Sequence, residues 1–438
     1  MRAFLQVLVS ASALIVSSRV HADVLVVNGA GGTPWQSIQA AVDAASDGDT
    51  ILVKRGVYRA FQIVSKGVRV FVDRNHSVQV FGKVVVADLA AAKTVVIAGL
   101  EMNGAPLASG TQARALELWQ CSGAVRVQDC RVLAGPDDPL SCDTASAVSV
   151  DGCLDVAFVH CTFEGASAHA TRGGKGGTGI SSELGSSVAV YDAVVRGGAG
   201  DSCNHPCSPP QICPHPLQDD WCPNSAYPDG AYGGDAFEGG SFLFASNSQF
   251  TGGVGGNSEP SGNYLYGGNG GDGIRACSFG TNVWTLDIDA EGGLPGHSGP
   301  AGFYGTPGTG MRATNGAAAN SMSGVSRTLA GANVVRANEP LALQFFGEPG
   351  DEVHLFIGSA PGFHLAPALR GVKLVHDARR IRIGQIGASG LLAVDLQLAG
   401  SGSGATAKTH FLQSLHGSTD GRATLGSALT VIVVDASI

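Results

Sequence analysis

The stretch that decides the fold is LELWQCSGAVRVQDCRVLAG, which runs from Leu116 to Gly135 and returns as VSVDGCLDVAFVHCTFEG from Val148 to Gly165. Each copy contains short runs of alternating apolar residues and closes on a glycine. Alternation with a period of two is typical of β-strands, and a strand unit that recurs at near-constant length is the signature of a solenoid. The sequence therefore predicts a stack of similar β-strand turns.

Later copies keep the pattern with lower identity. They begin at Ile180, Phe237 and Ile274, and a frayed copy begins at Met311. The copies stay near one length, whereas the joining segments vary, the longest starting at Gly197. In a solenoid such insertions collect on one face, which is often the binding face. We therefore expect the long loops at one corner of the stack.

Composition supports an all-β architecture and limits the partners. The chain has 438 residues with 64 glycines, 6% aromatic and 14% charged residues, and a formal net charge of −9. This composition argues against a compact helical enzyme. An acidic surface argues against nucleic acid as a partner and would repel a polyanionic glycan unless a cation bridged the two.

Residues 1–22 have the features of a secretory signal peptide. Arg2 supplies the charged start, an apolar run too short to span a bilayer extends from Ala3 to Val16, and a small-x-small cleavage site ends at Ala22. A buried first strand is the alternative interpretation. No later run reaches transmembrane length, so we expect a mature protein that is not membrane-spanning and is secreted or held at the cell surface.

A short amphipathic helix is expected soon after Asp23. Thr33 is predicted as its N-cap, with Gln36 completing a capping box. One apolar helical face is formed by Ile38, Ala41, Val42 and Ala45. A helix laid over the open end of a parallel solenoid would supply the terminal cap that such folds require.

The run SIQAAVDAASDGDTILVKRGVY, residues 37–58, resembles the opening of right-handed parallel β-helix proteins of the pectate lyase-like superfamily. The resemblance extends to about Ala313 and implies a right-handed parallel β-helix with an N-terminal capping helix, which we place at residues 23–324. Pectin methylesterases of that superfamily usually carry Glu two residues after the Tyr, where this chain has Ala60. The Asn-Thr-Asp and Gly-His-Gly motifs of polygalacturonases and the Trp-x-Asp-His of common pectate lyases are also absent. No catalytic residue can therefore be carried over from these families.

Residues 325–438 are predicted to form a small β-sandwich. About seven strand-like runs separated by turns follow one another, from LALQFFGEPGDEVHLFIGSA to ALTVIVVD. The closing run HFLQSLHGSTDGRATLGSALTVIVVD resembles the C-terminal domains of exported planctomycete-type proteins. That resemblance implies no activity.

The repeat cysteines are predicted to form disulfides between neighbouring turns. Stacking places Cys121 over Cys153 and Cys130 over Cys161. Neighbouring strands lie about 4.8 Å apart, inside the Cα separation of a disulfide. Such bridges are natural in an exported protein, and two ladders of free buried thiols are the alternative.

The segment from Asp201 to Pro228 holds further cysteines together with His205 and His215. The four are Cys203, Cys207, Cys213 and Cys222. A polar exported loop is usually held together by disulfides, which we predict here, and zinc binding is the alternative. The sequence assigns no partner to Cys142 or Cys277.

Gly-rich segments such as TRGGKGGTG and YGGNGGDG recur at the loop corner. None lies between a strand and a helix, so they are not nucleotide-binding loops. We predict that their glycines supply positive φ angles and allow close backbone stacking. Tyr264 and Tyr266 in these loops are candidate sugar-binding residues, and packing of the loops onto one another is the alternative.

The candidate catalytic residues come from two outward columns. If the first apolar residue of each repeat points inward, alternate residues after it point outward. One column is Glu117, Ser149, Ser181, Glu238, Arg275 and Arg312, and the other is Trp119, Asp151, Glu183, Gly240, Cys277 and Thr314.

Asp151 and Glu183 would thus lie on adjacent turns. One carboxyl group could keep its proton and act as an acid, while the other acts as a base or binds a metal. Glu238 follows along the same face, Arg275 could neutralise a substrate carboxylate, and Trp119 could stack on a sugar ring. A solvated wall of charges is the alternative.

Asp235 and Asp272 each stand two residues before a repeat and should be stacked neighbours at the loop corner. Paired carboxylates on a Gly-rich turn suit calcium, which is the one candidate cofactor. Hydrogen bonding of both carboxylates to turn amides is the alternative.

Two classes of function remain. The first is a protein that binds extracellular polysaccharide or serves as a structural or adhesive component of a surface. The alternative is a polysaccharide lyase or glycoside hydrolase that uses carboxylates on an outward strand face, with or without calcium. A solenoid fold does not decide between them.

Overall fold

The computed structural model describes residues 22–105, 113–136, 145–168, 175–183, 185–200, 232–240, 242–257, 267–276, 280–297, 304–314, 316–400 and 406–438. Several predictions fall outside these residues. They are the signal peptide, the sugar-binding roles of Tyr264 and Tyr266, and the disulfides of Cys203, Cys207, Cys213 and Cys222.

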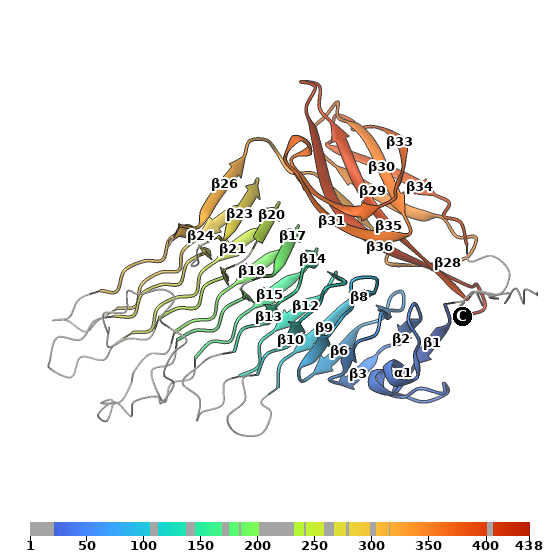
Figure 1. The fold of residues 1–438 in the computed structure, drawn as a ribbon, viewed down its shortest axis with the longest axis horizontal. Coiled ribbons are helices and arrows are strands. Elements are labelled where there is room, and N and C mark those ends of the chain that lie inside the picture. The colour runs from blue at the N-terminus through green and yellow to red at the C-terminus, as the bar shows by residue number, and fades with distance from the viewer. Residues whose placement is uncertain are drawn as a thin grey trace, which may run out of the picture.

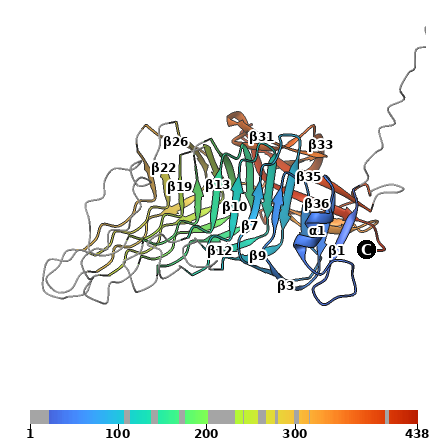
Figure 2. The ribbon, with the colours of Figure 1, turned by 60° about the horizontal axis from the view of Figure 1, so that its bottom comes forward.

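Three long parallel sheets form the first part of the chain (Figures 1 and 2). Sheet A consists of β1 (Val24–Val27), β2 (Thr50–Val53), β5 (Arg69–Val72), β8 (Thr94–Ala98), β11 (Ala124–Gln128), β14 (Asp155–Val159), β17 (Ser187–Tyr191), β20 (Phe242–Ser246), β23 (Asn282–Leu286) and β26 (Ala318–Met322).

Sheet B consists of β3 (Gly56–Arg59), β6 (Val78–Phe81), β9 (Leu100–Asn103), β12 (Arg131–Leu133), β15 (Thr162–Glu164), β18 (Val194–Arg196), β21 (Gln249–Thr251) and β24 (Asp289–Glu291). Sheet C consists of β4 (Gln62–Val64), β7 (Val84–Ala87), β10 (Leu116–Trp119), β13 (Val148–Asp151), β16 (Ile180–Ser182), β19 (Phe237–Gly239), β22 (Ile274–Ala276) and β25 (Met311–Ala313).

Successive strands pass from sheet A to B to C, and each such circuit forms one rung of a parallel β-helix. The repeats that begin at Leu116 and Val148 stack in the predicted register, since these two residues pair in a parallel ladder. Alternate residues of each strand, such as Val125 and Val127 of β11, point inward and are fully buried in one continuous apolar core. The predicted parallel β-helix is therefore confirmed, whereas its right hand stays a prediction.

Helix α1 (Ile38–Ala44) lies against the first rung. Ser37 is its N-cap, and the Ser37 side chain accepts a hydrogen bond from the backbone N–H of Ala40 at 3.2 Å. The predicted cap was wrong, because the Thr33 hydroxyl instead donates to the carbonyl oxygen of Trp35. The predicted apolar face is correct, and its four residues join the core of the β-helix.

The C-terminal part of the chain folds into mainly antiparallel sheets. One contains β27 (Thr328–Gly331), β29 (Leu341–Phe346) and β34 (Leu391–Leu396). The second contains β28 (Val334–Arg336), β36 (Ala423–Val434), β35 (Ala407–Gly417), β30 (Glu352–Gly358) and β33 (Arg379–Gln385). The pair β31 (Ala360–Ala366) and β32 (Gly371–His376) is linked by the 3-10 helix η2 (Pro367–Leu369). Buried residues of the first two sheets share one apolar core.

These C-terminal sheets cover the outer face of sheet A (Figure 1). The buried Tyr191 of β17 donates its hydroxyl proton to the carbonyl oxygen of Val372 and accepts from the N–H of the same residue, both at 3.0 Å. Gln128 of β11 pairs in the same two-way manner with the backbone of Thr430, at 2.8 Å in each direction. Outward apolar residues of sheet A, such as Phe71 and Phe244, are buried by this contact.

The four repeat cysteines are stacked as predicted but are free thiols, so the predicted disulfides are not formed. Stacked side chains on parallel rungs point the same way, which keeps Cβ atoms about 4.8 Å apart, whereas a disulfide needs about 3.8 Å. Each sulfur instead lies near backbone carbonyl oxygens, as between Cys161 and Val159 at 3.2 Å. The alternative of buried thiol ladders, formed by Cys121, Cys130, Cys153 and Cys161, describes the structure.

Gly-rich segments project between sheets B and C, and we call them the glycine arms (Figures 1 and 2). Their described parts are 134–136, 145–147, 165–168, 175–179, 197–200, 232–236, 252–257, 267–273, 292–297 and 304–310. Outgoing and returning segments alternate in one hydrogen-bonded ladder, in which each N–H donates to the preceding carbonyl oxygen at 2.7–3.1 Å. The ladder runs through Ala145, Ala166, Gly177, Gly198, Gly234, Gly253, Gly271, Gly293 and Gly308.

Close stacking explains the glycines of the arms. A Cβ added to Gly198 would lie 1.9 Å from the carbonyl oxygen of Ala166, a distance that real Cβ atoms do not reach. The predicted positive φ angles were wrong, because none of the described arm glycines has one. The predicted close backbone approach is confirmed.

Candidate functional site

The outward face of sheet C carries the first predicted column of polar residues and the start of the second, whose Cys277 lies outside the described residues. Glu117 pairs with Ser149 and Trp119 pairs with Asp151 across β10 and β13. The first column continues through Ser181, Glu238, Arg275 and Arg312. Glu183 directly follows β16, and its backbone N–H donates to the carbonyl oxygen of Val150 at 2.8 Å, which fixes it beside the end of β13.

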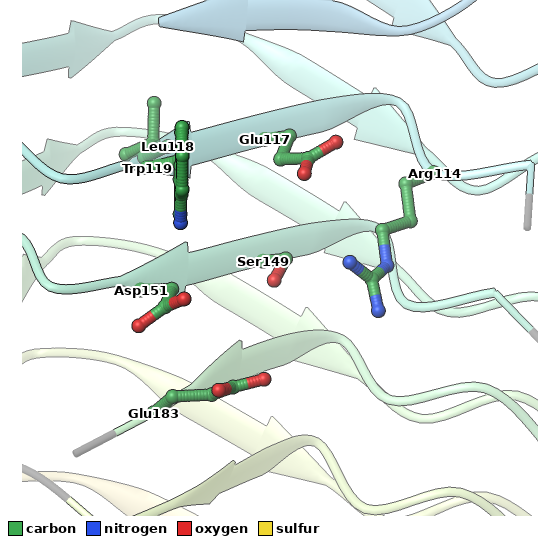
Figure 3. A pocket seen from close by; sticks show the side chains of 7 residues that line it. All are labelled: Arg114, Glu117, Leu118, Trp119, Ser149, Asp151 and Glu183. Carbon is green, nitrogen blue, oxygen red and sulfur yellow. The ribbon is translucent and has the colours of Figure 1, made fainter. Parts of the chain in front are cut away.

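A pocket with a volume of about 340 Å³ opens on this face. Figure 3 shows its lining side chains rising from three consecutive rungs. They are Arg114, Glu117, Leu118, Trp119, Ser149, Asp151 and Glu183. Because the ladder spacing of a parallel sheet is about 4.8 Å, the stacked polar groups fall within reach of one small ligand.

The carboxyl group of Glu183 in this pocket has a shifted pKa. Partial burial, and then the negative charge of Asp151, raise the pKa of the Glu183 carboxyl above its usual value, while Arg114 acts in the opposite direction. The structure thus brings Asp151 and Glu183 together as predicted, and their catalytic roles stay predictions.

Trp119 forms one wall of the pocket (Figure 3). Its side chain is 42% exposed, although large apolar side chains at most other positions of the β-helix are buried. An exposed indole beside hydrogen-bonding groups is the combination with which proteins hold sugar rings, because the ring stacks on the apolar faces while the hydroxyl groups bind at the edge.

Glu238 and Arg275 follow along the same face as predicted, but they do not line the pocket, and their catalytic roles stay predictions. The Arg275 guanidinium is 3.3 Å from a carboxylate oxygen of Asp235 and 3.8 Å from one of Glu238. Lys175 of the glycine arms also approaches both carboxylates. Lys175 and then Arg275 lower the pKa of Glu238, despite the opposing effect of its burial. These residues therefore form an ion-pair network at the base of the arms.

The paired aspartates are stacked neighbours as predicted, but their surroundings do not fit calcium. The backbone N–H of Asp272 donates to Asp235 at 2.6 Å, and Thr309 donates its N–H and hydroxyl to Asp272 at 2.8 and 2.9 Å. Arg275 and Arg312 pair with the two carboxylates. Among the described residues no group of three His, Cys, Asp or Glu side chains could hold a metal ion. Hydrogen bonding to turn amides, the alternative interpretation, describes this pair.

Sequence reasoning missed Arg114, Glu117 and Ser149 as pocket residues. Arg114 occupies the same arm-base position as Asp235 and Asp272, so the repeat alignment contained the signal. Glu117 and Ser149 belong to the predicted outward column, and Glu117 forms an ion pair with Lys83.

Comparisons with known proteins identify no family. No protein-family model and no curated protein matches the chain. Similar solved structures include the Siphovirus 9NA tailspike receptor binding domain, at 9% identity, covering 91% of this chain and 97% of that chain, with a TM-score of 0.16.

A second similar structure is the receptor-binding protein of bacteriophage Det7, a podoviral tailspike in a myovirus, at 10% identity, with 93% and 98% of the two chains covered and a TM-score of 0.16. A third is the soluble domain of PmoD from Methylocystis sp. ATCC 49242 (Rockwell), at 10% identity, with 26% of this chain and 95% of that chain covered and a TM-score of 0.16. Scores this low carry no argument about function. In the part of the chain that the structure describes, no helix is long and apolar enough to span a membrane.

Proposed function

We propose that this protein binds a polysaccharide in the pocket on the outward face of sheet C. The observation that carries the proposal is the exposed indole of Trp119, which stands over a row of hydrogen-bonding side chains supplied by consecutive rungs. A repeating ligand suits a repeating surface, because each rung presents the same backbone positions about 4.8 Å further along the axis.

The arrangement of the C-terminal sheets supports this location. They bury the outer face of sheet A, and the glycine arms leave the chain at the corner between sheets B and C. Sheet C with its pocket therefore stays open to a ligand, and Arg114 lies at the arm base beside the pocket.

Several finer features belong to the same proposal. The chain is exported by its N-terminal segment and works outside the cell or at its surface, where it also contributes to adhesion. Helix α1 caps the first rung, the C-terminal sheets form a β-sandwich, and the β-helix is a relative of the pectate lyase-like superfamily. The apolar face of α1 and the two-sheet core at the C-terminus support the capping helix and the sandwich.

Hydrolysis of the bound polysaccharide is the second candidate function. Two neighbouring carboxyl groups, of which Glu183 has a raised pKa, favour it, since cleavage of a glycosidic bond uses a pair of carboxyl groups as acid and as base or nucleophile. Replacing Asp151→Asn and Glu183→Gln should then abolish release of reducing ends while binding persists. Unchanged turnover in both variants would refute this candidate.

A glycan array followed by calorimetric titration tests the binding proposal. Trp119→Ala should weaken binding of the best glycan by about tenfold or more, because stacking on an aromatic face is lost. Phe81→Ala is the matched control, since Phe81 is a similarly exposed aromatic residue, 47% exposed, on sheet B. Equal affinities for wild type and Trp119→Ala, with unchanged melting curves, would refute the location.

A further inference from the structure

The charges around the pocket are unequal and only partly compensated. Three carboxylates line it, whereas Arg114 is its one lining cation. Glu117 is paired with Lys83, and Arg114 acts on Glu183. Asp151 has no ion-pair partner among the described residues, so the uncompensated negative charge lies at the Trp119 end of the pocket.

A serine with little exposure also lines this pocket. Ser149 is only 4% exposed, pairs with Glu117 across β10 and β13, and lies two residues before Asp151 on β13. Its side chain lines the cavity (Figure 3) and makes no hydrogen bond to any described residue. The hydroxyl is therefore available to a polar group of a ligand in the cavity.

We infer that the pocket selects a glycan with free amino groups, such as an unacetylated hexosamine polymer, and that Asp151 binds the ammonium group of the sugar bound on Trp119. This inference rests on the proposed polysaccharide binding. An ammonium placed there lies beside one uncompensated carboxylate and near an indole face, and both attract a cation. The Ser149 hydroxyl and the other carboxylates then bind neighbouring sugar hydroxyl groups.

The same charges disfavour two other classes of sugar, uronates and neutral N-acetylated sugars. A uronate would place its carboxylate among Glu117, Asp151 and Glu183, with Arg114 as the one counter-charge. Like charges at this spacing repel, and the net charge of −9 repels a polyuronate at longer range. A neutral N-acetylated sugar could still stack on Trp119, but it would leave the Asp151 charge without a partner.

The test is a calorimetric titration with three tetrasaccharides, built of glucosamine, N-acetylglucosamine or galacturonate, at about pH 6, where amines are protonated. The glucosamine tetramer should bind wild type at least about tenfold tighter than the N-acetylated one, as expected for a hydrogen bond to a charged group. Raised salt should reduce that preference. Asp151→Asn should bring the two affinities to within about a factor of two.

Glu291→Gln is the matched control, because it removes one carboxylate from an exposed position on sheet B and should leave the preference intact. Melting curves of all variants check the fold. Equal binding of both hexosamine tetramers, or an undiminished preference in Asp151→Asn, overturns the amine assignment while Trp119-dependent binding keeps the proposed function. Tighter binding of galacturonate also overturns it. Absence of binding to any glycan overturns both.

Discussion

The hydrogen-bonded ladder of the glycine arms predicts that Gly253→Ala, which adds one methyl group, strongly destabilises the arms and leaves the rest of the fold unaffected. A Cβ at this position would lie 1.9 Å from the carbonyl oxygen of Gly198, and ordinary contact begins at 3.4 Å. The arm must therefore shift by about 1.5 Å, which is more than a hydrogen bond tolerates. Two ladder bonds are lost, from Gly253 N–H to Gly234 at 2.7 Å and from Gly271 N–H to Gly253 at 2.8 Å.

The expected cost follows from these contacts. Two hydrogen bonds at about 1 kcal/mol each and overpacking of about 1–3 kcal/mol destabilise the arm. Alanine also reduces the conformational entropy of the unfolded chain, which stabilises the folded state by about 0.4–1 kcal/mol and offsets part of this cost. Gly253→Ala should thus lower the free energy of arm opening by about 2–4 kcal/mol.

Hydrogen–deuterium exchange with mass spectrometry measures this quantity, since it reports local opening of peptides that cover 252–257 and 267–273 separately from the rest of the chain. Gly387→Ala is the control, because its Cβ would meet nothing closer than the Leu391 carbonyl oxygen at 3.8 Å. Exchange in the arms of Gly253→Ala at the wild-type rate would refute the ladder.

Three further predictions concern other parts of the molecule. Burial alone would lower the pKa of His160, but Asp129 and Asp192 on adjacent rungs raise it to about 9. The stability contributed by the charged imidazole is therefore complete below about pH 6.5 and is lost as pH rises through 9. His160→Asn should remove about 3 kcal/mol of stability and this pH dependence, which denaturant unfolding from pH 6 to about 10 would reveal, and an unchanged pH profile would contradict it. Tyr191→Phe leaves the buried N–H and C=O of Val372 without their partner, and should destabilise the C-terminal sheets by about 2 kcal/mol in the same assay, whereas a neutral effect would show that the hydroxyl is dispensable. Alkylation of the denatured, unreduced protein should label every repeat cysteine, and a protected pair would contradict the thiol ladders, which comprise Cys121, Cys130, Cys153 and Cys161.

The rungs could be predicted from the sequence because their signal is local and repeated. The alternation that begins at Leu116 and Val148 fixes which side chains point inward, and parallel stacking then fixes the register, so Asp151 and Trp119 could be placed as neighbours in advance. The same logic failed for the cysteines. Register gives the distance between Cα atoms but stacked Cβ atoms point in parallel, so a pair such as Cys121 and Cys153 cannot approach to bonding distance.

Contacts between distant segments could not be predicted. Strands of sheet A carry apolar residues on both faces, such as Phe158 inward and Tyr191 outward. Only the folded structure shows that the C-terminal sheets cover the outward residues. Likewise, Arg275 was expected to meet substrate. In the structure Asp235, at the base of a glycine arm, pairs with Arg275. The repeat spacing placed Asp235 next to Asp272 but gave no side-chain direction from which the contact with Arg275 could be derived.

The central claim, that sheet C binds a glycan at Trp119, is tested most directly by determining the structure of the protein with a glucosamine oligosaccharide. We predict a sugar ring stacked on the Trp119 indole, with its amino group within hydrogen-bond distance of the Asp151 carboxylate and a hydroxyl group on Ser149. An oligosaccharide bound elsewhere, for example along the glycine arms, with the sheet C pocket unchanged, would contradict the account.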